Sequence, residues 1–281
     1  MPPGDTAEDD DALAGKACFD AIYTREDPRA YFAALRPLGY QIPQHAQAVI
    51  RRLIEVRRRP ETIVDLCCSY GVNAALLAHD VTLDGLYAHY AAEPSAAALT
   101  ALIAHDREYF ATRRRPDAPR MVGLDQSAPA IAYARAVGLL DAGFAEDLEA
   151  SEPSSAFREA VSEATLITVS GGVGYIGYRT FERVVAAIDD PPWVVALVLR
   201  EVSYEPIAGA LERFGLVTER LATRTFRQRR FADEEEQRAA LKRIDALGLS
   251  AAGQEDTGWY HAELFVSRPA ADADVPLAEL V

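Results

Sequence analysis

Cysteine is scarce in this chain of 281 residues, which has three, and two of them are neighbours, Cys67 and Cys68. So few cysteines exclude a disulfide framework and are typical of a reducing compartment, so we expect a cytoplasmic protein. Long hydrophobic runs are also missing, since no segment approaches the roughly 20 apolar residues that span a bilayer. The N-terminus is acidic and has no apolar core of a secretory signal, so neither a membrane span nor a signal peptide is expected.

Basic residues are also fewer than acidic ones. Lys and Arg total 29 against 43 Asp and Glu, which gives a formal net charge of −14. This balance argues against binding to nucleic acid or to an anionic membrane surface. The five histidines show no spacing with cysteine or acidic residues that is typical of metal ligands, so no metal is expected. We therefore expect a small-molecule substrate, bound by a monomer or a homodimer.

Strands alternate with helices from residue 63 to 202, and this alternation predicts an α/β protein with a mostly parallel sheet. We expect a Rossmann-like sheet of seven strands, of which the last is antiparallel. The segment 79–119 is far longer than an ordinary connection between a helix and a strand and is interpreted as a helical insertion. The expected division is a disordered leader at 1–15, a helical lid at 16–60, the main domain at 61–269 with its insertion at 79–119, and a solvated tail at 270–281.

The stretch TIVDLCCSYGVNAALLAHD, residues 62–80, predicts a buried strand, a tight turn and the start of a helix. Asp65 lies near the end of the strand, and the small residues Cys67, Ser69 and Gly71 follow it. In an open parallel sheet, ligands bind outside the carboxyl ends of the strands. Small side chains let a ligand approach the backbone, and the helix N-terminus offers free N–H groups. The sequence therefore predicts a ligand site at this turn.

This turn resembles the glycine-rich motif of class I S-adenosylmethionine-dependent methyltransferases, in which an acid is followed by three glycines at alternate positions. Here Cys67 and Ser69 stand at the first two glycine positions and Gly71 at the third. The second strand ends in Asp125, which matches the acid that accepts hydrogen bonds from the ribose hydroxyls in that family. Asp147, in GFAEDL, matches the acid that binds the adenine amine.

The resemblance covers roughly residues 63–269 and includes the small residues that end the fourth strand, LITVSGG, and the final strand, GWYHAELFVSRP. It implies S-adenosylmethionine as the cofactor and methyl transfer as the activity. The cofactor-binding residues that it implies are Asp65, Cys67, Ser69, Gly71, Asp125, Gln126, Asp147, Leu148, Ser170 and Gly171.

Residues outside the cofactor motif are candidates for the acceptor side. Helices before the first strand often form a lid in this family, and Tyr23, Tyr31 and Tyr40 are the lid candidates, with His45 as a candidate catalytic base. Tyr175 follows the fourth strand and is a candidate catalytic residue of the acceptor pocket. Methyl transfer is an in-line displacement that needs alignment and exclusion of water, so a strong catalytic signature is not required. The Asn/Asp-Pro-Pro-Tyr/Phe pattern of many base-methylating enzymes is missing, which favours a small-molecule acceptor.

Two alternatives stay open. A nicotinamide-dependent Rossmann oxidoreductase would carry GxGxxG and an acid about 20 residues beyond it, but no such run is present and Asp125 follows Asp65 by 60 residues. A non-catalytic protein with the methyltransferase fold would explain the replaced glycines, Cys67 and Ser69. The abundance of alanine and arginine is typical of GC-rich bacterial genomes, where methyltransferases often act in secondary metabolism.

Overall fold

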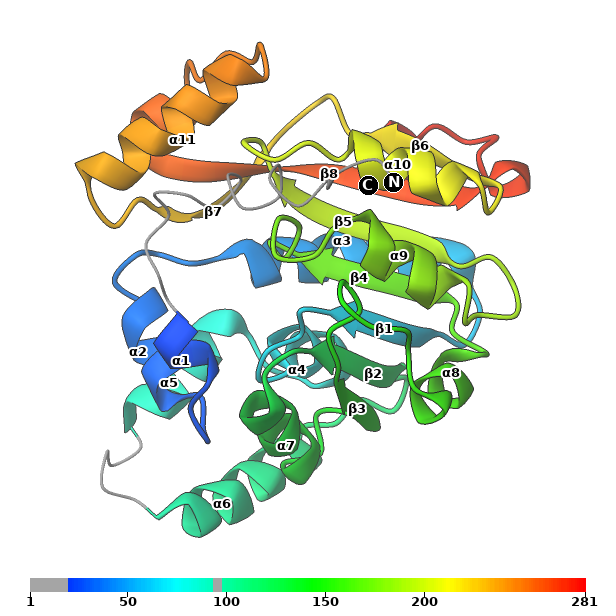
Figure 1. The fold of residues 1–281 in the computed structure, drawn as a ribbon. Helices are drawn as coiled ribbons and strands as arrows, with labels where there is room; N and C mark the ends of the chain where they lie inside the picture. Colours follow the sequence, from blue (N-terminus) through cyan, green and yellow to red (C-terminus); the bar gives the residue numbers. More distant parts are fainter. Residues whose placement is uncertain (1–19, 93–97) are drawn as a thin grey trace.

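The computed structural model describes residues 20–92 and 98–281 (Figure 1). Its strands all belong to one sheet. They are β1 (Thr62–Leu66), β2 (Arg120–Asp125), β3 (Ala142–Ala145), β4 (Leu166–Ser170), β5 (Trp193–Leu199), β6 (Leu216–Arg220), β7 (Phe226–Arg230) and β8 (Trp259–Pro269).

The strand order is β3-β2-β1-β4-β5-β8-β6, and β7 also pairs with β8. Neighbouring strands from β3 to β5 are parallel, whereas β8 runs antiparallel to β5, β6 and β7. This confirms the prediction of a Rossmann-like, mostly parallel sheet with an antiparallel last strand. The sheet has eight strands, one more than expected, because the alternating segment 216–230 forms two strands. They pair with opposite halves of the long β8: β6 with residues 265–269, and β7 with residues 259–262.

Helices cover both faces of the sheet, and the alternation of side chains along each strand divides the core in two. The helices are α1 (Asp20–Tyr23), α2 (Arg29–Leu35), α3 (Ile42–Arg57), α4 (Val72–Ala78), α5 (Leu83–Ala92), α6 (Leu99–Ala111), α7 (Ala128–Ala136), α8 (Ser155–Val161), α9 (Tyr178–Val185), α10 (Glu205–Glu212), α11 (Glu234–Ala246) and α12 (Leu277–Leu280). Ile63 of β1 faces a core shared with α3, α4 and α7, whereas Val64 and Leu66 face a core shared with α8, α9 and α10. In Figure 1 the helices α8 to α10 lie in front of the sheet and α3 lies behind it.

The last segment, 270–281, packs against the domain, contrary to the expectation of a solvated tail. Leu277 and Leu280 of α12 are buried, and the guanidinium of Arg268 donates to the backbone carbonyls of Asp272 and Val275. The expectation missed two leucines spaced at helical distance among the acidic residues, whose burial gives the segment an apolar anchor. The predicted leader, 1–15, lies outside the described residues.

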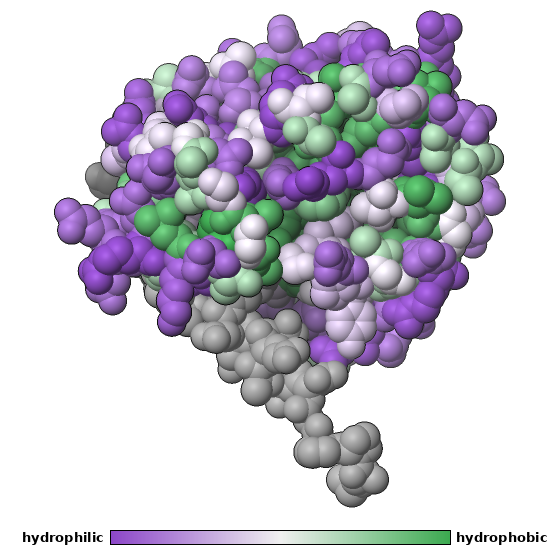
Figure 2. All heavy atoms as spheres, turned by 90° about the horizontal axis from the view of Figure 1, so that it is seen from above, coloured by the Kyte–Doolittle hydropathy of each residue, from purple (hydrophilic) through white to green (hydrophobic). Residues whose placement is uncertain are grey.

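The outer surface carries few large apolar side chains. The face seen from above in Figure 2 is mostly hydrophilic, with hydrophobic side chains in smaller patches between the polar ones. Among the described residues, the exposed large aliphatic side chains, Val217, Leu247 and Val275, lie far apart in the sequence. No helix in the described parts of the chain combines the length and the hydropathy that a membrane span needs.

Candidate functional site

The turn from β1 into α4 has the backbone shape that the glycine motif requires, with only one glycine. The φ angles are 53° at Cys67, 49° at Ser69 and 78° at Gly71, so all three alternate positions are left-handed. For a residue with a Cβ this conformation costs roughly 1–2 kcal/mol. Strain of this kind persists where the surrounding structure enforces it, and it clusters at functional sites.

A glycine on the neighbouring strand end makes room for the first of these side chains. A Cβ added at Gly172, just beyond β4, would lie 2.7 Å from the Cβ of Cys67. Gly172 therefore accommodates the side chain at the position where the resemblance implies glycine. Burial raises the pKa of the Cys67 thiol well above its ordinary value, so the group stays protonated and acts as a small packing residue.

Asp125, the last residue of β2, is held by backbone N–H groups of the turn after β1 and of the turn after β2. Its Oδ2 accepts a hydrogen bond from the N–H of Ser69 at 2.9 Å, and its Oδ1 accepts one from the N–H of Ser127 at 2.8 Å. Burial raises the pKa of this carboxyl, and the backbone donors oppose that shift. Each carboxylate oxygen keeps a second lone pair that can accept a hydrogen bond from a ligand.

Asp65 lies beneath the turn after β1, and its side chain is fully buried. Its Oδ1 accepts hydrogen bonds from Asn73 Nδ2 of α4 at 2.9 Å and from Thr168 Oγ1 of β4 at 2.8 Å. Its Oδ2 is buried without a hydrogen-bond partner, and desolvation by burial raises the pKa of the carboxyl to about 7. Asn73 Nδ2 is also 3.0 Å from Ser170 Oγ, so this network joins β1, α4 and β4 beneath the turn.

A cavity of about 450 Å³ lies at the carboxyl ends of β1, β2 and β4. The strand order reverses between β1 and β4, so the cavity occupies the switch point at which open α/β sheets bind ligands. Its volume is in the range of roughly 300–1,000 Å³ that small-molecule sites have. The predicted residues that line it are Cys67, Ser69, Asp125, Gln126, Leu148, Ser170, Gly171, Tyr23, Tyr31, Tyr40 and Tyr175.

Four predicted residues do not line this cavity. Asp65 lies beneath it, and Gly71 packs towards Ala134 and Leu139 of the α7 region. The exposed Asp147 instead caps its own loop, since its Oδ1 accepts from the N–H groups of residues 149 and 150. The ring of His45 lies 5.6 Å from that of Phe226 in β7, outside the cavity, and burial lowers its pKa.

The N-terminal helices close the cavity on the side opposite the strand ends. Tyr23 ends α1, Tyr31 lies in α2, and Tyr40 precedes α3. Hydrogen bonds hold these helices to the turns of the main domain: Ser127 Oγ donates to the carbonyl of Tyr23 at 2.6 Å, and Tyr70 Oη donates to the carbonyl of Ile22 at 2.8 Å. The 16–60 segment, described from residue 20, therefore contributes three tyrosines to the wall of the cavity, and its role as a lid stays a prediction.

The N-terminal segment also contacts the last part of the sheet, at β7. The N–H of Gln41 donates to the carbonyl of Gln228 at 2.8 Å, and the N–H of Arg230 donates to that of Leu38, also at 2.8 Å. β7, the additional strand, therefore holds the connection between α2 and α3 in place.

The charged side chains among the described lining residues of the cavity are all acidic. Asp125 and Glu146 are the acidic side chains of its wall, and no Lys, Arg or His occurs among its lining residues in the described chain. Burial raises the pKa values of Tyr23 and Tyr31 well above the ordinary value, and that of Tyr40 to about 12. The phenols are therefore neutral at physiological pH, and the wall suits a ligand with positive charge.

The predicted insertion contains two helices, α5 and α6, and none of its described residues lines the cavity. It supports the lid from outside instead. The ring of Phe32 in α2 stacks on Tyr90 of α5 at 4.4 Å, and Tyr87 Oη donates to the carbonyl of Tyr40 at 2.9 Å.

Sequence reasoning missed several residues that shape the site. Asn73 lies two residues beyond the glycine motif, and Glu146 directly precedes the predicted Asp147. Glu149 fixes the loop after β4, because its Oε1 accepts from the N–H groups of Gly177 and Thr180 at 2.8 and 3.0 Å. The first two were accessible from their place beside the motif, whereas the contact made by Glu149 spans 28 residues and leaves no local signal.

The order β3-β2-β1-β4-β5 is that of a doubly wound Rossmann sheet, and the reversed β8 beside β5 is the closing strand that the resemblance implies. The fold is therefore that of class I methyltransferases.

No family model and no curated protein sequence matches the chain. Solved structures that match include the YcgJ protein from Bacillus subtilis, with 9% identity, 80% of this chain and 98% of that chain covered, and a TM-score of 0.46. A TehB-like SAM-dependent methyltransferase from Corynebacterium glutamicum matches with 15% identity, coverages of 76% and 85%, and a TM-score of 0.37. Magnesium protoporphyrin IX methyltransferase from Synechocystis PCC 6803, with bound SAM, matches with 9% identity, coverages of 94% and 92%, and a TM-score of 0.41.

Proposed function

We propose that this protein binds S-adenosylmethionine and transfers its methyl group to a small-molecule acceptor. One observation carries the proposal: the cavity at the switch point presents Asp125 and Glu146 without a basic side chain among its described lining residues. The cofactor carries a sulfonium and an ammonium group, so this charge suits it. A nicotinamide dinucleotide carries an anionic pyrophosphate, which favours a glycine-rich helix N-terminus or a basic side chain, so the same observation weighs against the oxidoreductase alternative.

The cofactor-binding roles follow the order of the strand ends. The free lone pairs of Asp125 would accept hydrogen bonds from the ribose diol, with Gln126 beside it. Ser170 and Gly171, at the end of β4, would flank the methionine part. The resemblance assigns the adenine amine to Asp147, but the acid of that loop that lines the cavity is Glu146, and we assign the role to Glu146 instead.

The bound cofactor supplies a methyl group on a sulfonium, which leaves a neutral thioether after in-line displacement. The protein would align the acceptor and exclude water, and the lid tyrosines Tyr23, Tyr31 and Tyr40 close the cavity for that purpose. With His45 outside the cavity, no imidazole base is at hand in the described lining. An acid-walled site of this kind favours a neutral or cationic acceptor whose nucleophilic atom needs no proton removed by a histidine.

Calorimetric titration tests the proposal. The protein should bind S-adenosylmethionine and its demethylated product, and Asp125→Ala should weaken both by roughly 100-fold, because charge-assisted hydrogen bonds are lost. Asp147→Asn is the matched control: it removes a neighbouring charge outside the cavity and keeps an oxygen to cap the loop, so binding should not change. Circular dichroism of each variant establishes that it is folded.

Different outcomes separate the alternatives. If the native protein binds neither nucleoside, the proposal is wrong and the non-catalytic alternative, which the side chains of Cys67 and Ser69 in the cavity wall favour, takes its place. Binding of reduced nicotinamide cofactor with a fluorescence change would instead support an oxidoreductase.

A further inference from the structure

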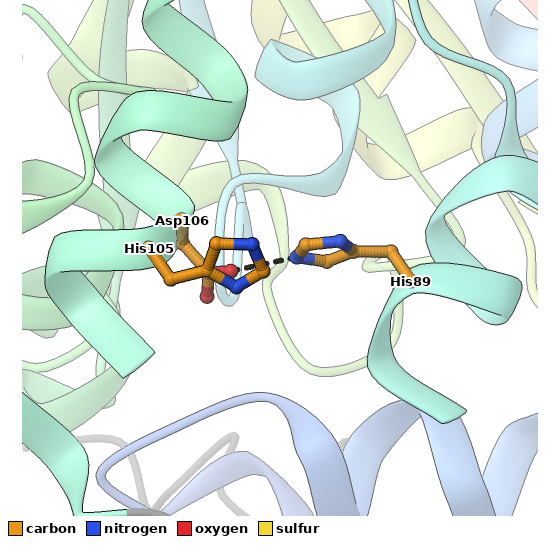
Figure 3. A group of neighbouring side chains, drawn as sticks. All are labelled: His89, His105 and Asp106. Carbon is orange, nitrogen blue, oxygen red and sulfur yellow. Dashed lines mark hydrogen bonds and ion pairs between the residues drawn. The ribbon is translucent and has the colours of Figure 1, made fainter. Parts of the chain in front are cut away.

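A cluster of possible metal ligands lies outside the cavity, between the two helices of the insertion (Figure 3). His89 comes from α5, and His105 and Asp106 come from α6. One ligand atom from each residue lies within 4.8 Å of the others. His89 Nε2 is 2.6 Å from Asp106 Oδ1, and in Figure 3 the ring of His105 lies beside this contact. Sequence reasoning did not find the cluster, because its residues do not have the spacing of a metal motif.

The carboxylate of Asp106 is oriented in the way that metal-ligating carboxylates are. The residue is fully buried, and its Oδ2 accepts a hydrogen bond from Tyr133 Oη of α7. Tyr133 Oη is in turn 2.8 Å from Tyr90 Oη. A second hydrogen bond of this kind fixes a ligand and leaves its other oxygen directed at the ion. Burying a carboxylate is costly unless a strong partner compensates, and a divalent cation is such a partner.

The imidazole of His89 is also held in place. Its ring stacks on Tyr109 of α6 with the centroids 4.0 Å apart, and the side chain is only 8% exposed. His105 is exposed and completes the group from the solvent side, so an ion could enter there and keep a water in its fourth position. Two imidazoles and one carboxylate are the ligands that zinc and similar transition metals prefer, whereas magnesium and calcium prefer oxygen ligands.

We propose that His89, His105 and Asp106 bind a divalent transition metal ion of the zinc type. Zinc binds imidazole nitrogen and carboxylate oxygen at about 2.0–2.2 Å, so tetrahedral ligand atoms lie about 3.3 Å apart. The contact between His89 and Asp106 would open from 2.6 Å to admit the ion, and the ligand atom of His105, within 4.8 Å of the other two, would approach it.

The ion would join three helices, of which α5 packs against the lid helix α2. It joins α5 to α6 directly and, through Tyr133, reaches α7. The residue after His89 is Tyr90, which stacks on Phe32 of the lid helix α2. Zinc is therefore a structural element of the insertion and takes no part in the cavity, so this inference does not depend on the proposed function.

Zinc titration of the full chain, stripped of metal with a chelator, tests this inference. We expect one zinc per chain by calorimetry and a rise in the melting temperature of roughly 5 °C at a hundredfold excess over the dissociation constant. Magnesium at the same concentration should bind weakly or not at all. His105→Ala should weaken zinc binding by roughly 100-fold or more and remove the rise, while the exposed position lets the variant fold.

Two more variants distinguish this site from adventitious zinc binding elsewhere on the surface. Glu108→Ala removes an exposed acid of the same helix and should bind zinc like the native protein. Tyr133→Phe keeps all three ligands but removes the hydrogen bond to Asp106, and should weaken zinc binding by roughly tenfold. Zinc binding that His105→Ala leaves unchanged, or no binding to the native chain, would overturn the proposal and leave His89 and Asp106 as a hydrogen-bonded pair without an ion.

Discussion

The carboxylate of Asp125 accepts a hydrogen bond from the backbone N–H of Ser69 across the gap between β2 and the turn after β1. The two residues are 56 positions apart, and each was identified from a different motif. The hydrogen bond explains why Ser69 tolerates a left-handed backbone: its N–H must point at the carboxylate. Asp125 and the turn after β1 therefore fix each other before any ligand arrives.

Replacing Ser69 by glycine should stabilise the protein. Glycine adopts the φ of 49° without strain, and the change also removes a buried Oγ that has no hydrogen-bond partner in the described structure. Against this stands the greater freedom of glycine in the unfolded chain, so we expect a net gain of about 1 kcal/mol for Ser69→Gly in urea unfolding. Ser69→Ala is the control, since it removes the hydroxyl and keeps the strained Cβ. Equal stability of the two variants would show that strain is not the cause.

The buried carboxyl of Asp65 should make stability fall as the pH rises. Its folded pKa of about 7 lies above the ordinary 3.8, so the folded protein keeps a proton that the unfolded chain releases. The free energy of unfolding then decreases between about pH 4 and pH 7, by up to about 4 kcal/mol in total. Asp65→Asn keeps an acceptor for Asn73 and Thr168 and has no charge to bury.

This variant should be more stable than the native protein at about pH 8, and the advantage should shrink towards about pH 4. Urea unfolding of both proteins across this range provides the measurement, and other titrating groups cancel in the difference. An advantage that stays constant with pH would mean that Asp65 is not the group that titrates.

Local patterns were enough to predict the strands β1 to β5, the turn after β1 and the place of Asp125 at the end of β2, because each depends on neighbouring residues. A buried strand followed by small residues is visible in residues 62–71, and the expectation of a ligand site beside them follows from sheet geometry. The direction in which a loop side chain points cannot be predicted from such a local pattern. Glu146 and Asp147 are adjacent acids, and only the turn formed by residues 147–150 decides that the first lines the cavity and the second caps the loop.

Contacts between distant segments were also beyond the sequence. His45 packs against Phe226 of a strand that the sequence did not separate from its neighbour, so its place outside the cavity was not predictable. His89 and Asp106 meet because two helices of the insertion pack together, and periodicity does not say which faces meet.

Removing the carboxylate of Glu149 should loosen the glycine-rich loop that carries Tyr175. Its Oε1 accepts hydrogen bonds from Gly177 and Thr180 at the start of α9, where a negative charge is also favourable. Because hydrogen bonds to a charged group contribute more than neutral ones, Glu149→Ala should lower the free energy of unfolding by roughly 2–3 kcal/mol. The control is Glu152→Ala, three residues further along the segment that carries Glu149. The side chain of Glu152 is 75% exposed in its pair with Arg183, so this substitution should lower the free energy of unfolding by less than about 1 kcal/mol. Similar losses in the two variants would refute this role.

The buried ion pair of Arg229 in β7 and Glu236 in α11 should lose stability when one partner is removed, but apolar residues should be able to replace both partners together. The two side chains are 3% and 1% exposed, and the terminal guanidinium nitrogens Nη2 and Nη1 donate to the two carboxylate oxygens at 2.6 and 2.8 Å. Glu236→Ala leaves a buried positive charge without its main counter-charge and should cost roughly 3–5 kcal/mol in urea unfolding. The double variant Arg229→Met/Glu236→Leu removes both charges and should recover most of that loss.

The same variants report on the lid, because β7 holds the connection between α2 and α3 through Gln228 and Arg230. Glu236→Ala should therefore weaken the binding of S-adenosylmethionine, measured by calorimetry at a temperature where the variant is still folded, and the double variant should restore it. A double variant as unstable as Glu236→Ala would contradict the prediction, since the cost would then come from lost packing of the side chains rather than from an uncompensated charge.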